Sequence, residues 1–203
     1  MKPQTKRKQQ AIETKERIFK CAVALFGQYS YENVTVNDIC QAAQVSIGAF
    51  YHHFKNKECI LNEGYRLFDD QLEAAWDDGH PDNDLEAIRF LVAGQMQSMQ
   101  QMGALAASQY FKNQLTYEEK YILNKDRFFY RTIYEAVQGE LTSENLFGEA
   151  QTITEDILSN CRGIIYDWCL HEGSYDLMLK GERVLEMVLY YYSKSIDKGA
   201  GAE

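Results

Sequence analysis

Residues 35–54 read TVNDICQAAQVSIGAFYHHF, and this stretch predicts two short helices joined by a tight turn. Thr35 is followed three residues later by Asp38, which is the pattern of a capping box, where two side chains satisfy free amide groups at a helix start. Ser46 can cap the second helix. The two caps place the turn around Gln44 and Val45.

The second helix has two unequal faces. Phe50 and Phe54 are four residues apart and share a face with Val45, so we expect them to anchor the helix to its neighbours. The opposite face carries an aliphatic residue, a glycine, a phenol and an imidazole: Ile47, Gly48, Tyr51 and His52. This mixture suits a groove of DNA better than it suits solvent. Glycine inside a helix costs roughly 1 kcal/mol relative to alanine, and close approach of another surface would explain the glycine.

The flanking sequence makes the pattern specific. The preceding RIFKCAVALFGQYSYENVTV and the following FKNKECIL carry ALF at 24–26 and TVNDI at 35–39, and S-x-G-x-F-Y-x-H-F-x-x-K-E runs from Ser46 to Glu58. Over residues 12–73 the chain resembles the N-terminal DNA-binding domain of the TetR family of bacterial transcriptional repressors. The resemblance implies a helix-turn-helix domain at 12–73, with the helix-turn-helix at about 35–54.

The resemblance also implies which residues meet DNA, because the start of the second helix enters the major groove while its flanks contact phosphate. The expected base-edge residues are Ser46, Ile47, Gly48 and Ala49, and the expected positioning residues are Thr35, Tyr51, Lys55 and Lys57, with His52 on the same face. We expect His53 to pack under the helix. Two positions depart from the family pattern. Gln44 fills a turn position usually given to glycine or asparagine, and Ile47 fills one often basic or polar. Isoleucine cannot hydrogen-bond, so it should prefer a thymine methyl group.

Composition predicts an all-α globular protein. The 203 residues are 45% apolar and include only two prolines, and few runs alternate between apolar and polar residues. We expect three parts: a basic arm at 1–11, the DNA-binding domain at 12–73 and a C-terminal regulatory and dimerisation domain at 74–203. A long helix at about 56–78, capped by Asn56, joins the last two. The other expected helices cover about 13–29, 84–102, 104–113, 116–137, 149–172 and 180–195, with Asp82 or Asn83, and Thr116 with Glu119, as caps.

Charge is divided unevenly along the chain. The net charge is −9, yet residues 1–60 contain nine Lys or Arg against five Asp or Glu. Only the N-terminal part therefore suits phosphate, and the acidic remainder would repel DNA and help orient the molecule on it. The expected partner is a double-stranded DNA operator.

Several functions are disfavoured. G-x-G-x-x-G, G-x-S-x-G, H-E-x-x-H and a Walker-type lysine loop are all missing from the sequence, so we expect neither an enzyme nor a cofactor. Five scattered cysteines without a C-x-x-C pair predict reduced thiols in a cytoplasmic protein; a metal or redox site at Cys161, Cys169 and His171 is the less favoured reading. No apolar run approaches the length of a membrane span, and the N-terminus lacks the centre of a signal peptide, so we expect no membrane partner.

The C-terminal part is rich in aromatic and methionine side chains that can fill a core or line a cavity for an apolar or aromatic effector, whose identity the sequence does not give. The cavity candidates are Phe90, Met96, Met99, Tyr110, Phe129, Tyr130, Tyr134 and Trp168. By the TetR resemblance, the last two helices pair with their copies across a two-fold axis, and the chain is a homodimer on a palindromic operator. The interface candidates are Ile153, Ile157, Cys161, Ile164, Val184, Val188 and Tyr192.

The favoured reading is a repressor released from DNA when an effector presses on the long fourth helix. Two alternatives remain. A small-molecule-binding protein or enzyme on the helical domain leaves the basic N-terminal part unexplained, and a protein-interaction module leaves the exposed helix face unexplained.

Overall fold

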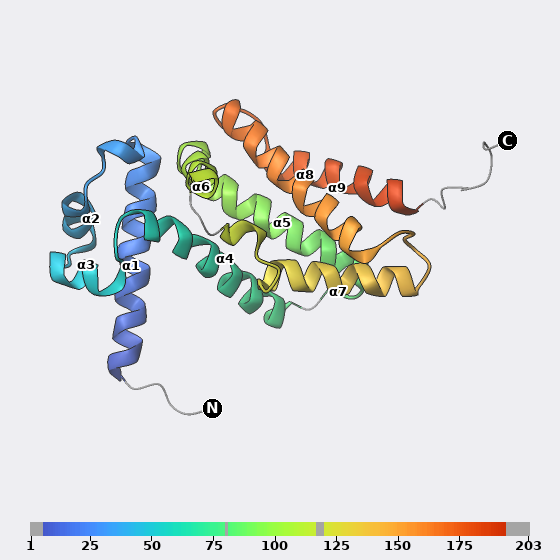
Figure 1. Cartoon of the computed structure of the whole chain (residues 1–203), viewed down its shortest axis with the longest axis horizontal. Coiled ribbons are helices and arrows are strands. Elements are labelled where there is room, and N and C mark those ends of the chain that lie inside the picture. Colours follow the sequence, from blue (N-terminus) through green and yellow to red (C-terminus); the bar gives the residue numbers. More distant parts are fainter. Residues whose placement is uncertain (1–5, 80, 117–119, 194–203) are drawn as a thin grey trace. The chain divides into compact units, whose positions relative to one another are not determined.

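The computed structural model describes residues 6–79, 81–116 and 120–193, and every regular element in these ranges is helical (Figure 1). The expected all-α class is therefore confirmed. The α-helices are α1 (Lys6–Gln28), α2 (Val36–Ala43), α3 (Ile47–His53), α4 (Glu58–Asp78), α5 (Asp84–Met102), α6 (Ala104–Thr116), α7 (Phe128–Thr142), α8 (Ala150–Leu170) and α9 (Leu177–Ser193), with short 3-10 helices η1 (Tyr31–Asn33) and η2 (Tyr121–Leu123).

The chain forms two compact units. The first comprises Met1–Phe68 with Gln101–Leu123, and the second comprises Asp69–Gln100 with Asn124–Glu203. Helix α6 therefore belongs with the N-terminal helices, although it lies far beyond them in sequence. The expected functional division at residues 73 and 74 stays a prediction.

The first unit has one apolar core. Ile18, Ala22 and Phe26 recur on one face of α1 and are fully buried, together with Phe50 of α3. Helix α6 adds Tyr110, whose ring lies so close to Gly64 of α4 that a Cβ atom there would overlap it. Gly64 thus permits the close approach of α4 and α6, and α6 becomes part of the support beneath the helix-turn-helix.

The second unit is a bundle built mainly from α5, α7, α8 and α9. Leu91 of α5, Ile133 of α7 and Ile157 of α8 are buried in it, and α9 adds Leu185 and Leu189. Burying such side chains contributes about 1.5–3 kcal/mol each, so the bundle rests on these apolar stripes.

A buried ion pair lies within the second unit. Arg127 donates from Nε and Nη2 to the two carboxylate oxygens of Asp69 at 2.8 and 2.9 Å, and both side chains are almost completely buried. Removing one partner of such a pair typically costs about 3–5 kcal/mol, because a charge is left uncompensated. The pair therefore fixes the start of α7 against the second half of α4.

Helix α7 begins later than its sequence pattern predicts. Thr116 is the last residue of α6, and its hydroxyl donates to the carbonyls of Lys112 and Asn113, so it does not cap a new helix. Glu119 lies outside the described residues. The seventh helix starts at Phe128 after Arg127, which makes no side-chain capping bond. Other caps are confirmed: Asn56 Oδ1 accepts from the amide of Cys59, and Asn83 Oδ1 accepts from the amide of Glu86.

The expected basic arm is partly helical. Helix α1 starts at Lys6, so residues 6–11 continue the helix rather than forming a separate arm, and residues 1–5 lie outside the described part. Good helix-forming residues in KRKQQ extend the pattern of α1 by more than one turn.

Candidate DNA-binding surface

Helix α2 has the capping box expected from its sequence. Thr35 Oγ1 accepts from the amide of Asp38 at 3.2 Å, and the Asp38 carboxylate accepts from the amide of Thr35 at 2.8 Å. The hydroxyl of Thr35 also donates to the Asp38 carboxylate at 2.6 Å, and this hydrogen bond, followed by the one from the Thr35 amide, lowers the pKa of Asp38. The capping box holds this helix start in place, and both side chains are exposed, so the helix start is accessible.

The turn after α2 relies on a left-handed residue. Gln44 has φ 53° and ψ 47°, and its amide together with that of Val45 bonds back to carbonyls of the last turn of α2. This is a Schellman-type helix end, which usually has glycine at the left-handed position. From α1, Arg17 Nε donates to the carbonyl of Ala43 at 3.0 Å and so secures the same helix end. Sequence reasoning missed Arg17, because its partner lies 26 residues away.

Helix α3 is anchored on one face and open on the other. Ser46 Oγ accepts from the amide of Ala49 at 3.1 Å, and Phe50 is fully buried. On the opposite face, Ile47 is 51% exposed and Tyr51 55% exposed. A Cβ atom on Gly48 would meet only Ser46 Oγ, at 3.9 Å, so packing inside the chain does not require glycine there. An apolar, exposed helix face with no side chain at its centre fits close contact with a partner outside the chain.

The two histidines differ as expected. His52 is exposed beside Tyr51, whereas His53 is half-buried, with its ring centroid 5.1 Å from that of His52. Burial, followed by repulsion from His52 and Lys15, lowers the pKa of His53. His53 therefore supports α3 from beneath, and His52 remains on the outer face.

Lys57 lies in a different environment from the one expected of a phosphate contact. Its Nζ donates to the carbonyls of Tyr31 and Val34 at 2.6 and 2.8 Å, and it lies 4.0 Å from the centre of the Tyr31 ring. Two of its three N–H donors are thus engaged inside the chain, and desolvation lowers its pKa. Lys57 ties η1 and the approach to α2 to the start of α4. Lys55, two residues earlier, is exposed and stays a candidate for phosphate contact.

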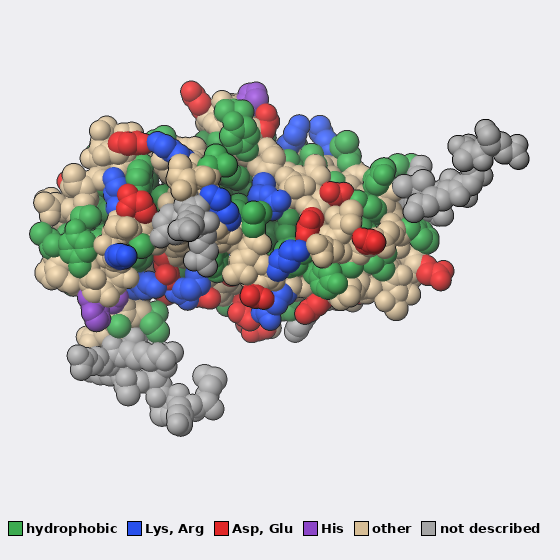
Figure 2. All heavy atoms as spheres, viewed as in Figure 1, with side chains coloured by type: hydrophobic (Ala, Val, Ile, Leu, Met, Phe, Trp, Pro, Cys, Tyr) green, Lys and Arg blue, Asp and Glu red, His purple; other side chains and the backbone are tan. Residues whose placement is uncertain are grey.

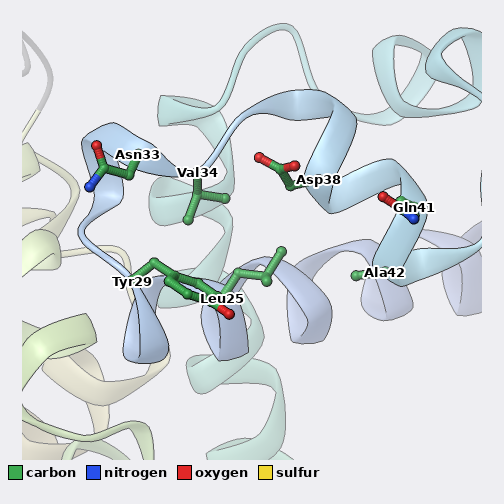
Figure 3. Close-up of a pocket in the computed structure, with 7 residues that line it drawn as sticks. All are labelled: Leu25, Tyr29, Asn33, Val34, Asp38, Gln41 and Ala42. Atoms are coloured by element: carbon green, nitrogen blue, oxygen red, sulfur yellow. The ribbon is translucent and has the colours of Figure 1, made fainter.

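A surface pocket of about 450 Å³ lies beside the helix-turn-helix, between the end of α1 and α2 (Figure 3). Leu25, Tyr29 and Ala42 supply its apolar wall, and Asp38 and Gln41 of α2 supply polar groups. The expected base-edge residues 46–49 do not line it. Figure 2 shows charged side chains of both signs intermingled with hydrophobic ones on one face of the molecule.

The structure separates the expected cavity residues. Tyr110 belongs to the core of the first unit, where it packs edge-on against Tyr65 with ring centroids 5.3 Å apart. Met96, Met99, Phe129 and Trp168 are buried in the second unit, and Phe90, Tyr130 and Tyr134 are partly exposed there. Trp168 Nε1 donates to the carbonyl of Tyr175 at 2.9 Å, which satisfies its polar atom as core residues require. A cavity role for the eight residues stays a prediction.

Four of the expected interface residues on α8 are core residues of a single chain. Ile153, Ile157, Cys161 and Ile164 are all at least nine-tenths buried, because α7 and α9 cover them. Buried side chains offer no surface to a second copy, so we correct the predicted interface at these four positions. On α9, Val184, Val188 and Tyr192 are partly exposed. The exposed apolar residues of the two helices are instead Tyr166, Leu170, Leu179, Met187, Tyr190 and Tyr191.

The described residues contain neither a membrane-spanning helix nor a group of side chains arranged to hold a metal ion. None of their helices is long and apolar enough to cross a membrane. Within the same ranges, no group of three or more His, Cys, Asp or Glu side chains is arranged to hold a metal ion.

Comparison with known proteins identifies the helix-turn-helix segment. The family described as "Bacterial regulatory proteins, tetR family" matches residues 18–63. The "Probable acrEF/envCD operon repressor" of Escherichia coli (strain K12) is 26% identical over 196 residues, which cover 90% of this chain and 88% of that protein.

Solved structures show the same fold. A bacterial regulatory protein of the tetR family from Rhodococcus RHA1 aligns with a TM-score of 0.63 at 17% identity, covering 90% of this chain and 98% of that one. Thermus thermophilus FadR in complex with lauroyl-CoA aligns with a TM-score of 0.62 at 19% identity, covering 93% and 100%.

Proposed function

We propose that the chain is a DNA-binding transcriptional regulator of the TetR family, which represses transcription as a homodimer bound to a two-fold symmetric operator and is released by a small-molecule effector. The observation that carries the DNA-binding part is the exposed face of α3. Ile47, Gly48 and Tyr51 lie there directly after the cap at Ser46, with Phe50 buried behind them.

The exposed side of α8 and α9 supports the dimer. Gly163, Tyr166 and Leu170 follow one another at spacings of three and four, and a Cβ atom at Gly163 would meet nothing within 4 Å. On α9, Leu179 and Met187 are eight residues apart, with Arg183 midway. Two such stripes, met by their copies across a two-fold axis, would make a four-helix bundle with a small residue at its closest approach. Large exposed apolar patches of this kind commonly mark protein interfaces.

The proposed dimer predicts the shape of the DNA site. Two recognition helices related by a two-fold axis read half-sites about 34–36 Å apart, so the operator should be roughly palindromic. Ser46, Ile47, Gly48 and Ala49 are proposed to contact base edges, and Thr35, Tyr51, His52 and Lys55 to lie against the backbone or the groove wall.

The effector is proposed to carry a large apolar part. FadR of Thermus thermophilus, which shares the fold, binds lauroyl-CoA in its solved complex, and the second unit here offers Met and aromatic side chains for an apolar molecule. Helix α4 contributes Leu61 to the first unit and Leu72 to the second, so one continuous helix can carry a displacement. A 100-fold loss of operator affinity requires an effector that favours the released state by about 2.7 kcal/mol.

Gel-shift on the gene's own upstream DNA, combined with analytical ultracentrifugation, tests the proposal. We expect a dimer that shifts a palindromic fragment and is displaced by a long-chain acyl-CoA or an aromatic, apolar compound. A monomer that binds all fragments equally would refute both the dimer and the operator.

A further inference from the structure

A groove of about 510 Å³ in the second unit has both apolar and charged walls. It lies among the start of α5, the end of α7, the loop that follows α7 and the end of α9. Leu85, Leu146, Leu189 and Tyr190 form the apolar wall. This volume falls within the range of about 300–1,000 Å³ that is usual for small-molecule sites.

One carboxylate in this groove is almost completely buried. Glu140 is 6% exposed, and its Oε2 accepts from Nδ2 of Asn145 at 2.8 Å. Among the residues that the structure describes, no Lys, Arg or His side chain forms an ion pair with it. Burying an ionised carboxylate without a cation is costly, so Glu140 provides a strong site for an incoming positive charge.

The one cation among the described lining residues is already neutralised. Arg89 donates to both carboxylate oxygens of Glu186 at 2.7 and 3.2 Å and to Glu86 at 2.8 Å. These hydrogen bonds raise the pKa of Arg89. Asp84 adds another acid beside the groove, since its carboxylate lies where a Cβ atom of Gly139 would be. The electrostatic balance of the described lining is therefore negative, with Glu140 as the carboxylate that pairs with no described cation.

We propose that this groove binds a small organic cation, a protonated primary amine with an aromatic or aliphatic body. The ammonium group donates to the Glu140 carboxylate in a charge-assisted hydrogen bond. The body packs against Leu146, Leu189 and the Tyr190 ring, which is 60% exposed in the chain. The test does not depend on the proposed repression, because binding of the amine is measured without DNA.

Calorimetric titration of the full-length protein at pH 7 tests the proposal, with protonated 2-phenylethylamine as probe and neutral 2-phenylethanol as its uncharged counterpart. We expect the amine to bind at least about tenfold more tightly than the alcohol. Glu140→Gln keeps an oxygen that accepts from Asn145 but removes the charge, so it should weaken the amine by at least about tenfold. Glu144→Gln makes the same charge change at an exposed position of the following loop and should leave the affinity unchanged.

A variant of the apolar wall tests the site even if Glu140→Gln does not fold. Tyr190→Ala removes an exposed wall and should weaken the amine severalfold. Absence of amine binding, equal affinities for amine and alcohol, or wild-type affinity in either Glu140→Gln or Tyr190→Ala would overturn the proposal.

Discussion

Replacing Lys57 by alanine should destabilise the DNA-binding unit rather than remove a phosphate contact. The ammonium group holds the carbonyls of Tyr31 and Val34 and lies over the Tyr31 ring. Alanine removes this donor from both carbonyls, and the Tyr31 carbonyl then accepts only from the amide of Val34 at 3.3 Å. The segment that leads into the capping box of α2 then loses its tie to α4.

The size of the effect follows from these two bonds. Hydrogen bonds to a charged group contribute about 1.5–3 kcal/mol each. Desolvation of Lys57, which lowers its pKa, offsets part of this gain, and its partial exposure weakens the bonds further. We therefore expect a total loss of about 2 kcal/mol, or a decrease of about 4–8 °C in melting temperature for a chain of this size.

The assay compares Lys57→Ala with Lys55→Ala, which changes an exposed lysine two residues away. Urea unfolding reports stability, and operator binding at several salt concentrations reports phosphate contacts. Lys55→Ala should keep the stability of the wild type and lower the salt slope by about 0.9 for each subunit. Lys57→Ala should lose stability and keep the slope. The reasoning is refuted if Lys57→Ala melts like the wild type while its salt slope decreases.

Four further substitutions test the turn, the interface and the support of α3. Gln44→Gly removes the steric strain of a left-handed non-glycine residue and should raise the free energy of unfolding by about 1 kcal/mol. An unchanged or lower free energy in urea unfolding would show that Gln44 is not strained. Met187→Glu changes a position that is 65% exposed and should give a folded monomer in ultracentrifugation. Ile157→Glu changes a position that is 1% exposed and should unfold the second unit. A folded, monomeric Ile157→Glu protein would instead support the interface predicted from the sequence. Because the folded state lowers the pKa of His53, the unfolded state binds a proton more readily and stability should fall as pH drops below about 6.5. His53→Asn should reduce that pH dependence, and an identical pH profile of the melting temperature would contradict this assignment.

Local patterns were sufficient where a structure depends on neighbouring residues. The capping box of Thr35 and Asp38, the cap at Ser46 and the burial of Phe50 all follow from spacings of a few residues, and the structure confirms them. The exposure of Ile47 follows from the same helical period.

Contacts between residues far apart in the sequence could not be predicted from local patterns. The carbonyl partners of Lys57 lie 26 and 23 residues away, and the place of α6 depends on the packing of Tyr110 against Gly64. A local capping pattern at Thr116 was misleading, because α6 continues through it. Helix α8 is apolar on more than one side, so periodicity alone could not tell the stripe of Ile157 that the chain buries from the exposed stripe of Tyr166.

The central claim is that the exposed face of α3 reads DNA sequence. Selection of binding sites from random duplexes by the wild-type protein and by Ile47→Gln tests it most directly. We predict a palindromic consensus for the wild type, and a change of preference confined to symmetric positions of both half-sites for the variant, with an equal salt slope, because an amide replaces an apolar contact at a base edge. An identical consensus for the two proteins, or no consensus at all, would contradict the assignment of α3 as the recognition helix.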